Sequence, residues 1–318
     1  MIITIEGPTA AGKTAIALML AEALNTRIVN CDSRQVYRYM DIGTAKPSKE
    51  ELARVQHHLI DIIDPGQIYN AGLFVKDAAK FIASLQKENK IPIICGGTGL
   101  YVRSLLEGLF EHPPIDSAIR VALKAELESL GVSVLYQRLQ AIDPDFAKRI
   151  SENDPQRILR GLEIYAATGL SISEHWKRQK RVPRYRAMRI LVSPARAILY
   201  ERINKRVEDM LSAGLVSEIE ALICRGYTWQ DPGLNTLGYK EFKDFFEGKS
   251  ELHVCAELVA QHHRNYAKRQ LTWYRKCRFD LTFGLQSFSL SDVLGEIETR
   301  YMRYKEETGA HHSQDSKT

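Results

Sequence analysis

Eight consecutive residues near the N-terminus have the composition of a phosphate-binding loop. Residues 7–14 (GPTAAGKT) match the pattern G-x-x-x-x-G-K-[ST], between a strand-like segment and a helical one. Such a loop turns backbone N–H groups toward phosphate oxygens, and the following helix adds the positive end of its dipole. A chance match is the alternative, and the correct flanks argue against it. We predict that a diphosphate or triphosphate is held by Gly7, Pro8, Thr9, Ala10, Ala11, Gly12, Lys13 and Thr14.

Within this loop, two side chains have separate chemical tasks. Lys13 supplies a full positive charge to the terminal phosphate, and the Thr14 hydroxyl is suited to ligate Mg²⁺. The loop by itself does not specify ATP. An enzyme that hydrolyses nucleoside triphosphates normally needs a second acidic residue at a strand end.

No good candidate for that second acid is present. The apolar segment 91–95 is followed by Gly96-Gly97-Thr98, without a carboxylate. Asp61 and Asp64 follow apolar residues, but Asp64-Pro65-Gly66 is typical of a turn. Hydrolysis of ATP is therefore poorly supported.

Asp32 directly follows the apolar segment 27–31, which we interpret as a second strand. Ligands of parallel α/β sheets bind at the carboxyl ends of the strands, so this carboxylate can point into the phosphate site. There it could act as a general base on a weakly acidic group of an acceptor. The alternative is that Asp32 only caps a turn, and the sequence leaves both open.

Arg202 and Arg206 lie one helical turn apart and share a face. Such a pair can clamp phosphate oxygens and stabilise a leaving diphosphate. The alternative is surface pairing with Glu201 or Glu208, and the spacing does not decide between the two.

Positive charge is concentrated in two segments. Residues 176–189 carry seven Lys and Arg, and residues 264–278 carry six together with Tyr266, Trp273 and Tyr274; neither contains an acid. Cations neutralise backbone phosphates and aromatic rings stack on unstacked bases, a combination suited to single-stranded RNA loops. The alternative is a solvated helix face. The net charge of +5 agrees weakly with a polyanionic partner.

Strand-like and helical patterns alternate in the first part of the chain. This order predicts a parallel sheet with helices on both faces, hence an α/β fold with a P-loop NTPase-like core. The expected strands are 2–6, 27–31 and 91–95, and the expected helices are 14–24 and 72–88.

Helical patterns dominate from about residue 115 to residue 185, at 117–130, 132–141 and 155–167. The strand-like segment 186–193 could rejoin the sheet, and helices are expected at 196–225 and 253–276. We therefore predict a core of residues 1–115 and 186–305, a helical insertion domain of residues 116–185, and a disordered tail of residues 306–318.

Cysteine usage indicates a reducing compartment. The five cysteines are odd in number and form no CxxC pair, so a disulfide framework or a zinc site is not expected and the cytoplasm is the simpler location. The sequence contains no run of about 18 apolar residues, so a membrane span is not predicted, and no secretory leader is expected.

Taken together, eight segments resemble the bacterial form of the tRNA dimethylallyltransferase (tRNA isopentenyltransferase) family. The resemblance implies dimethylallyl diphosphate as donor, and as acceptor the N6 amine of the tRNA adenine 3′-adjacent to the anticodon, position 37. The product would be N6-dimethylallyladenosine, with diphosphate released. The segments are GPTAAGKT (7–14), DSRQVY (32–37), MDIGTAKP (40–47), HHLIDI (57–62), GGTGLY (96–101), NDPQRILRGLEIY (153–165), LGYKE (237–241) and AKRQLTWYR (267–275).

The resemblance also assigns roles. Lys13, Mg²⁺ on Thr14, and Arg206 would neutralise charge as diphosphate leaves, while Asp32 would take the proton from N6. Thr98 would act near the reacting groups, and the insertion would grip the anticodon arm. Contacts with tRNA are implied for Asp32, Ser33, Arg34, Gln35, Thr98, Arg120, Gln156, Arg157, Ile158, Leu159, Arg160, Asn235, Thr236, Leu237, Gly238, Tyr239, Lys240, Lys268, Arg269, Gln270, Leu271, Thr272, Trp273, Tyr274 and Arg275.

One departure from some relatives concerns zinc. Eukaryotic members can carry a C-terminal zinc finger, but here His311 and His312 are accompanied by no cysteine pair, so no zinc is expected. We expect a monomer. Three alternative functions are considered: a transferase that prenylates free adenylate, a P-loop small-molecule kinase, and a non-catalytic RNA-binding protein or nucleotide-gated switch.

Overall fold

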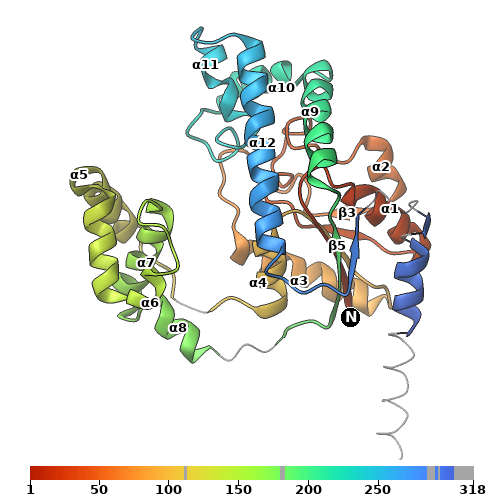
Figure 1. Cartoon of the computed structure of the whole chain (residues 1–318), viewed down its shortest axis with the longest axis horizontal. Coiled ribbons are helices and arrows are strands. Elements are labelled where there is room, and N and C mark those ends of the chain that lie inside the picture. The colour runs from red at the N-terminus through yellow and green to blue at the C-terminus, as the bar shows by residue number, and fades with distance from the viewer. Residues whose placement is uncertain (111–112, 180–182, 285–290, 293, 304–318) are drawn as a thin grey trace, which may run out of the picture. The chain divides into compact units, whose positions relative to one another are not determined.

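A sheet of six strands, all parallel, forms the centre of the fold (Figure 1). In the computed structural model, residues 1–110, 113–179, 183–284, 291–292 and 294–303 are described. The strand order is β3-β2-β4-β1-β5-β6. The strands are β1 (Ile2–Glu6), β2 (Ile28–Asn30), β3 (His57–His58), β4 (Ile93–Gly96), β5 (Ala187–Val192) and β6 (Leu281–Phe283).

The central strand is β1, which pairs with β4 and β5, with Ile3 opposite both Ile93 and Met188. All five of its residues are buried, as expected for a strand covered on both faces. Its last residue, Glu6, forms a two-pronged ion pair with Arg189 of β5, with both N–O distances 2.9 Å. The pairing of β5 with β1 confirms that the chain returns to the sheet after the helical segments.

The α/β fold with a P-loop-like core is confirmed. The predicted segments 2–6 and 27–31 contain β1 and β2, and the predicted segment 91–95 overlaps β4, which ends one residue later. Strands β3 and β6 were not predicted. They contain two and three residues. Such short segments give no periodic pattern, so only their pairing with β2 and β5 reveals them.

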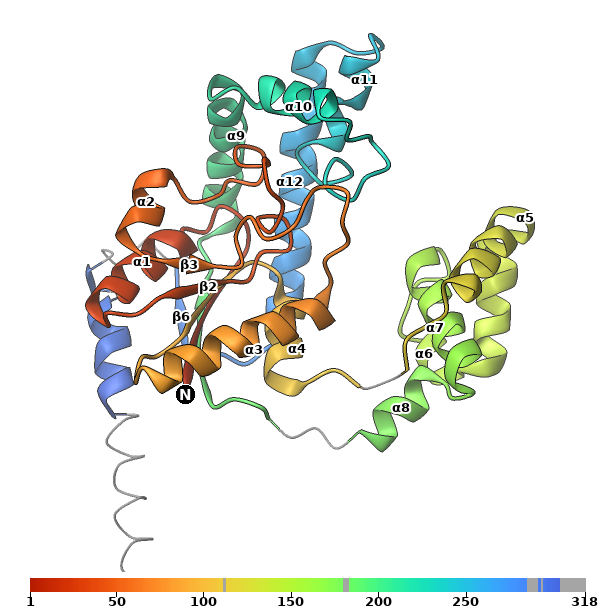
Figure 2. The same ribbon diagram turned by 180° about the vertical axis from the view of Figure 1, so that it is seen from behind.

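Helix α1 (Lys13–Ala23) packs its apolar residues against the sheet in the main hydrophobic core. Helices α9 (Arg196–Ser212) and α12 (Leu252–Tyr274) lie side by side (Figures 1 and 2). The helical region expected over 196–225 is confirmed, and it consists of two helices, because Gly214 with a φ of 99° separates α9 from α10 (Leu215–Cys224). The remaining elements here are α2 (Lys49–Arg54), α3 (Ala71–Lys87), α4 (Gly99–Glu107), a 3₁₀ turn (Lys240–Phe242) and α11 (Lys243–Phe246).

The chain divides into two compact units, residues 1–106 with the described residues from 184 onward, and residues 107–183. The second unit has its own apolar core, which Phe110 and Ile115 join. The unit therefore begins before residue 116, the expected boundary. Phe110 and Ile115 precede the first helical pattern, at 117–130, so that pattern could not assign them to this unit. Its helices are α5 (Ser117–Ile142), α6 (Pro144–Ala147), α7 (Pro155–Thr168) and α8 (Ile172–Arg178).

Helix α5 contains the break predicted between 117–130 and 132–141. Gly131 has φ 80° and ψ 166°, which interrupts the helical backbone. The predicted tail 306–318 lies outside the described residues. Among the helices that are described, none has the length and apolarity required to cross a bilayer.

Candidate active site

The phosphate loop joins β1 to α1, and its backbone requires both motif glycines. Gly12 has a left-handed φ of 93° at the start of α1. At Gly7, a Cβ atom would lie 2.2 Å from the carbonyl oxygen of Val192 in β5. The neighbouring sheet strand therefore excludes a side chain here, and the loop can approach β5 closely.

Lys13 points back into the loop, where its Nζ donates to the Pro8 carbonyl oxygen at 2.7 Å. Burial lowers the pKa of Lys13 to about 8, although the nearby Cys95 and Asp32 favour the charged form. A ligand with negative charge would raise this pKa again and favour the protonated ammonium. The lysine is therefore poised to bind an anion.

Helix α12 holds the phosphate loop in place through Gln270. Its Oε1 accepts from the Thr9 N–H at 2.8 Å, and its Nε2 donates to the Gly97 carbonyl oxygen at 2.8 Å. The Tyr274 hydroxyl donates to the same Gly97 carbonyl oxygen at 3.2 Å. One helix thus links the loop after β1 to the loop after β4.

This result narrows the role expected for residues 268–275. Gln270 is 6% exposed and Tyr274 is 2% exposed, so their side chains support the phosphate loop and are not presented to RNA. Leu271 packs against the main core. The spacing of the sequence could have indicated this, because Gln270 and Tyr274 continue the helical spacing set by the apolar Cys255, Val259 and Ala267. The buried residues of α12 are Cys255, Val259, Ala260, His263, Ala267, Gln270 and Tyr274.

Two arginines of α9 reach the phosphate loop. Arg206 donates from Nη1 to Thr9 Oγ1 at 3.3 Å, and Arg202 donates to the Ala11 carbonyl oxygen at 3.5 Å. They border a cavity of about 560 Å³ together with Ala10 and Gly12 of the loop. Burial lowers the pKa of Arg206, while the Asp32 carboxylate opposes that shift. The geometry favours the phosphate-clamp interpretation of this pair.

Asp32 has the turn-capping role that the sequence left open, and it also lies beside the cations of the phosphate loop. Its Oδ1 accepts from the Arg34 N–H at 2.8 Å, so it does cap a turn. It is also half-buried, and its charge favours the protonated forms of Lys13 and Arg206. Beside it, the Ser33 N–H donates to Thr98 Oγ1 at 3.1 Å, which places Thr98 at the same edge of the sheet.

Asp32 lines a cavity of about 330 Å³, a volume that fits a small organic group such as a nucleobase. Five of the segments singled out in the sequence meet there, although up to 260 residues separate them. Tyr266 adds an aromatic face. The lining residues are Thr9, Asp32, Ser33, Arg34, Gly43, Thr44, Asn235, Thr236, Leu237, Lys240, His263, Tyr266 and Arg269.

Several predicted RNA contacts outside this cavity divide by exposure. Along α12, Lys268, Thr272 and Arg275 are exposed, and Trp273 lies under Arg103, whose guanidinium carbon is 4.5 Å from the ring centroid. In contrast, the side chain of Gln35 is engaged with the carbonyl oxygens of residues 44 and 45. The Gly238 backbone and the Tyr239 ring are buried.

Within the unit of residues 107–183, Arg120 and Arg160 both pair with Glu163, at 3.7 and 3.5 Å. Gln156 and Arg157 are exposed on the same helix α7. Ile158 is fully buried and Leu159 packs against this unit's core, so neither presents a polar group. Of the RNA contacts expected in this unit, the candidates that remain are the polar side chains of Arg120, Gln156, Arg157 and Arg160.

The first basic segment, 176–189, is only partly available to RNA. Trp176 packs edge-on against Phe146, and Arg189 is engaged by the buried Glu6. Residues 180–182 lie outside the described residues.

Asp64, which the sequence offered as a possible second acid, forms the expected turn, because its carbonyl oxygen accepts from the Gln67 N–H at 2.9 Å.

The site suits a hard cation that arrives with a diphosphate. Among the described residues, no group of three His, Cys, Asp or Glu side chains could hold a metal ion. Mg²⁺ is commonly held by one or two protein oxygens, phosphate oxygens and water. Thr14, half-buried at the first turn of α1, offers one such oxygen beside the phosphate loop.

A family model described as IPP transferase matches residues 35–277 of the chain. The chain belongs to this family. It is 43% identical over 296 residues to "tRNA dimethylallyltransferase" of Thermotoga maritima, covering 93% of this chain and 95% of that protein. It is 44% identical over 276 residues to "tRNA dimethylallyltransferase 1" of Syntrophotalea carbinolica, with 86% and 88% covered.

Two solved structures are also similar. The full-length tRNA isopentenylpyrophosphate transferase of Bacillus halodurans has a TM-score of 0.73 at 35% identity, covering 98% of this chain and 99% of that one. A eukaryotic dimethylallyltransferase acting on tRNA has a TM-score of 0.75 at 30% identity, covering 86% and 69%. These relatives align with nearly the whole chain, which agrees with the resemblance of the eight sequence segments to the same family.

Proposed function

We propose that the protein transfers a dimethylallyl group from dimethylallyl diphosphate to N6 of the adenine 3′-adjacent to the anticodon of tRNA, position 37. The products are N6-dimethylallyladenosine and diphosphate. The observation that carries this proposal is the position of Thr9. Its hydroxyl accepts from Arg206 of the phosphate clamp, and the same residue lines the cavity of Asp32. A diphosphate site and a carboxylate-bearing cavity therefore share one wall.

The leaving group would be stabilised by the cations around the phosphate loop. As the allylic C–O bond breaks, negative charge grows on the diphosphate. Lys13, Arg202 and Arg206 contact the loop that would hold it. Preorganised positive charge in a partly buried site lowers the barrier for such a departure. When bound with Thr14, Mg²⁺ would add further positive charge to this region.

The acceptor amine would be activated from the other side of Thr9. N6 attacks the allylic carbon, a C–N bond forms, and the proton of the amine passes to the Asp32 carboxylate. An adenine must leave its stack for this chemistry, and a cavity of about 330 Å³ accommodates one base. Tyr266 in the cavity wall can stack on it.

Exposed cations would hold the rest of the tRNA. Lys240, Lys268 and Arg269 are exposed near the cavity or along α12, and Arg157 is exposed in the helical unit. Cationic side chains supply most of the affinity for a nucleic acid backbone. The printed names of the relatives, which include a transferase acting on tRNA, support this choice over free adenylate.

The proposal is tested by incubation with labelled dimethylallyl diphosphate and unmodified tRNA, followed by nucleoside analysis. We expect the label in N6-dimethylallyladenosine, and no label when adenine 37 is replaced by guanine. Parallel reactions contain AMP in place of tRNA, or ATP in place of the prenyl donor. Transfer to AMP alone, or phosphorylation from ATP, would refute the proposal.

A further inference from the structure

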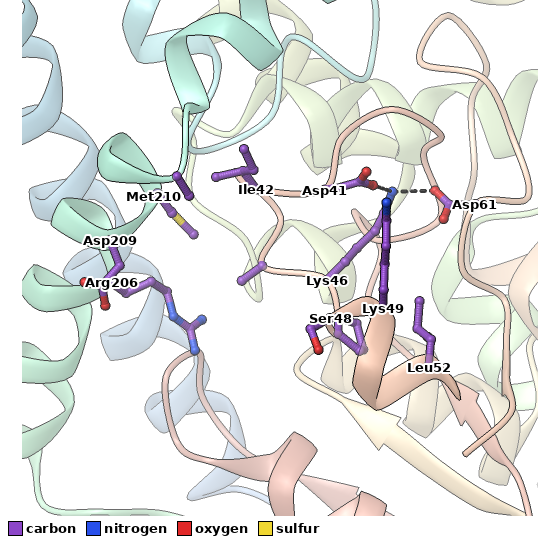
Figure 3. A pocket seen from close by; sticks show the side chains of 13 residues that line it. Asp41, Ile42, Lys46, Ser48, Lys49, Leu52, Asp61, Arg206, Asp209 and Met210 are labelled. Carbon is purple, nitrogen blue, oxygen red and sulfur yellow. Dashed lines mark hydrogen bonds and ion pairs between the residues drawn. The ribbon is translucent and has the colours of Figure 1, made fainter. Parts of the chain in front are cut away.

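Residues 40–47 (MDIGTAKP) form a loop after β2 that lines two cavities at once. Its residues Gly43 and Thr44 line the cavity of Asp32. Ile42 and Lys46 line a second cavity of about 480 Å³, which reaches α9. Figure 3 shows Arg206 and Met210 of α9 on one side of this second cavity and the loop on the other. The loop therefore adjoins both the carboxylate cavity and the phosphate clamp.

One carboxylate, Glu218 of α10, holds the first half of this loop. Its Oε2 accepts from the N–H groups of Asp41 and Ile42, both at 2.8 Å, and its Oε1 accepts from the N–H of Gly43 at 3.1 Å. Successive N–H groups that converge in this way form a concavity for an anion. Hydrogen bonds to a charged acceptor are stronger than neutral ones. Here the anion is the protein's own side chain.

Tyr239 connects this arrangement to the segment 235–240, other residues of which also line the Asp32 cavity. Its hydroxyl donates to Glu218 Oε1 at 2.7 Å. Burial and the neighbouring Glu218 hold the pKa of Tyr239 well above its usual value, so the hydroxyl remains a donor. Its ring lies so close to Gly43 that a Cβ atom there would be 2.4 Å away. The segments 40–47 and 235–240 are thus tied together.

The second half of the loop is held separately. Gln35 Nε2 donates to the carbonyl oxygens of Thr44 and Ala45, at 3.2 and 2.9 Å. Lys46 Nζ donates to the Tyr37 carbonyl oxygen at 2.7 Å. The partners Gln35 and Tyr37 lie within ten residues of the loop in sequence. Glu218 lies about 175 residues away, so its hydrogen bonds make the position of the loop depend on the position of α10.

We propose that Glu218 is a positioning residue for prenyl transfer: it fixes residues 40–47 so that the target base beside Asp32 and the donor beside Arg206 are held at a productive separation. This inference rests on the proposed function. A displacement of about 1 Å at a reacting centre is sufficient to cost about a hundredfold in rate. No other side chain binds the N–H groups of Asp41, Ile42 and Gly43 among the bonds found in the described residues.

The decisive variant is Glu218→Gln, which keeps the shape but replaces one acceptor oxygen with a donor that faces N–H groups. We expect kcat to fall about ten- to hundredfold. The Kd for tRNA and its salt slope should stay within about twofold of wild type, because no phosphate-binding cation is changed. Glu220→Gln, an exposed change on the same helix, is the matched control and should leave kcat unchanged.

A readout independent of activity is amide hydrogen exchange over residues 40–47. In Glu218→Gln these amides should exchange faster than in wild type or Glu220→Gln, while peptides of the sheet core do not change. Tyr239→Phe keeps the ring against Gly43 and should produce a smaller loss of kcat in the same direction. It serves as the second test if Glu218→Gln folds poorly.

Three results would overturn the inference. They are a wild-type kcat in Glu218→Gln, unchanged exchange of residues 40–47, or a loss of kcat matched by equal losses of tRNA affinity and thermal stability. If wild-type protein itself prenylates no tRNA, the proposed function fails instead. The exchange comparison still decides whether Glu218 holds the loop.

Discussion

Arginine and glutamine occur on helices both beside the phosphate loop and in the unit of residues 107–183, but in contrasting surroundings. Beside the loop, Gln270 is 6% exposed and hydrogen-bonded at both ends, and Arg206 is half-buried. In the helical unit, Gln156 is exposed and the side chain of Arg157 is 63% exposed. The same residue types thus form a preorganised site in one region and an accessible charged surface in the other.

This contrast separates two kinds of contribution. Groups held by buried partners cost little reorganisation during reaction, which favours rate acceleration. Exposed cations can follow a large and mobile polyanion, which favours affinity with a strong dependence on salt. Changes beside the phosphate loop should therefore lower kcat or donor use, and changes in the helical unit should lower tRNA affinity.

The largest effect is expected for Asp32→Ala. Loss of a general base typically lowers the rate by about 10²–10⁴, so kcat should fall in this range while the Kd for tRNA stays near wild type. Asp32→Asn is the control, because its amide oxygen can still accept from the Arg34 N–H and cap the turn. Wild-type turnover by Asp32→Asn would leave Asp32 with the capping role alone.

Lys13→Ala should mainly impair use of the donor. Removal of one group that stabilises developing charge lowers the rate by about 10²–10³, and we expect a loss of this size in kcat/KM for dimethylallyl diphosphate. Steady-state kinetics at saturating tRNA provide the measurement. An unchanged kcat and donor KM would contradict the role of the loop.

The pH dependence sharpens the same point. The protonated form of Lys13 neutralises the diphosphate, and its pKa in the free protein is lowered to about 8 by burial. Donor kcat/KM should therefore be retained below this pH and fall by up to about tenfold per pH unit above it. Lys13→Arg keeps its charge and should show no such fall. A profile identical for both proteins would exclude Lys13 as the titrating group.

A smaller effect is expected for Gln270→Leu, which removes the link between α12 and the phosphate loop. The N–H of the half-buried Thr9 loses its acceptor, and a buried donor left without a partner typically costs about 1–3 kcal/mol, so the cost here should lie toward the lower end of that range. We expect about a tenfold loss of donor kcat/KM and a lower Tm, without a change in the salt slope of tRNA binding. The control is Gln261→Leu, the same substitution at an exposed position of α12, which should have neither effect.

The smallest effect on rate is expected in the helical unit. The double variant Arg157→Ala with Arg160→Ala should weaken tRNA binding several-fold and reduce the salt slope by about 1.4–1.8 if each arginine neutralises one phosphate. Both arginines are in partly exposed ion pairs, so the free energy of unfolding should change by less than about 1 kcal/mol. A collapse of kcat at saturating tRNA would remove the contrast between the two regions.

Sequence alone was sufficient for the phosphate loop and for most long elements. Residues 7–14 are contiguous, and their glycines, lysine and helix start have local causes. Helices α3, α7 and α12 and strand β1 have clear periodicity or apolar runs, and the predictions for them agree with the structure within a few residues. The break at Gly131 was also predicted, whereas that at Gly214 was missed because apolar periodicity continues on both sides.

Only the tertiary structure decided which distant residues act together. Gln270 binds Thr9 across 261 residues of sequence, and Arg206 reaches the same residue across 197. Periodicity along α12 indicates that Gln270 is buried, but it does not name the groups that satisfy its amide. The partner is determined by how α12, α9 and the sheet pack, because hydrogen bonds between side chain and loop require positions that no local pattern encodes.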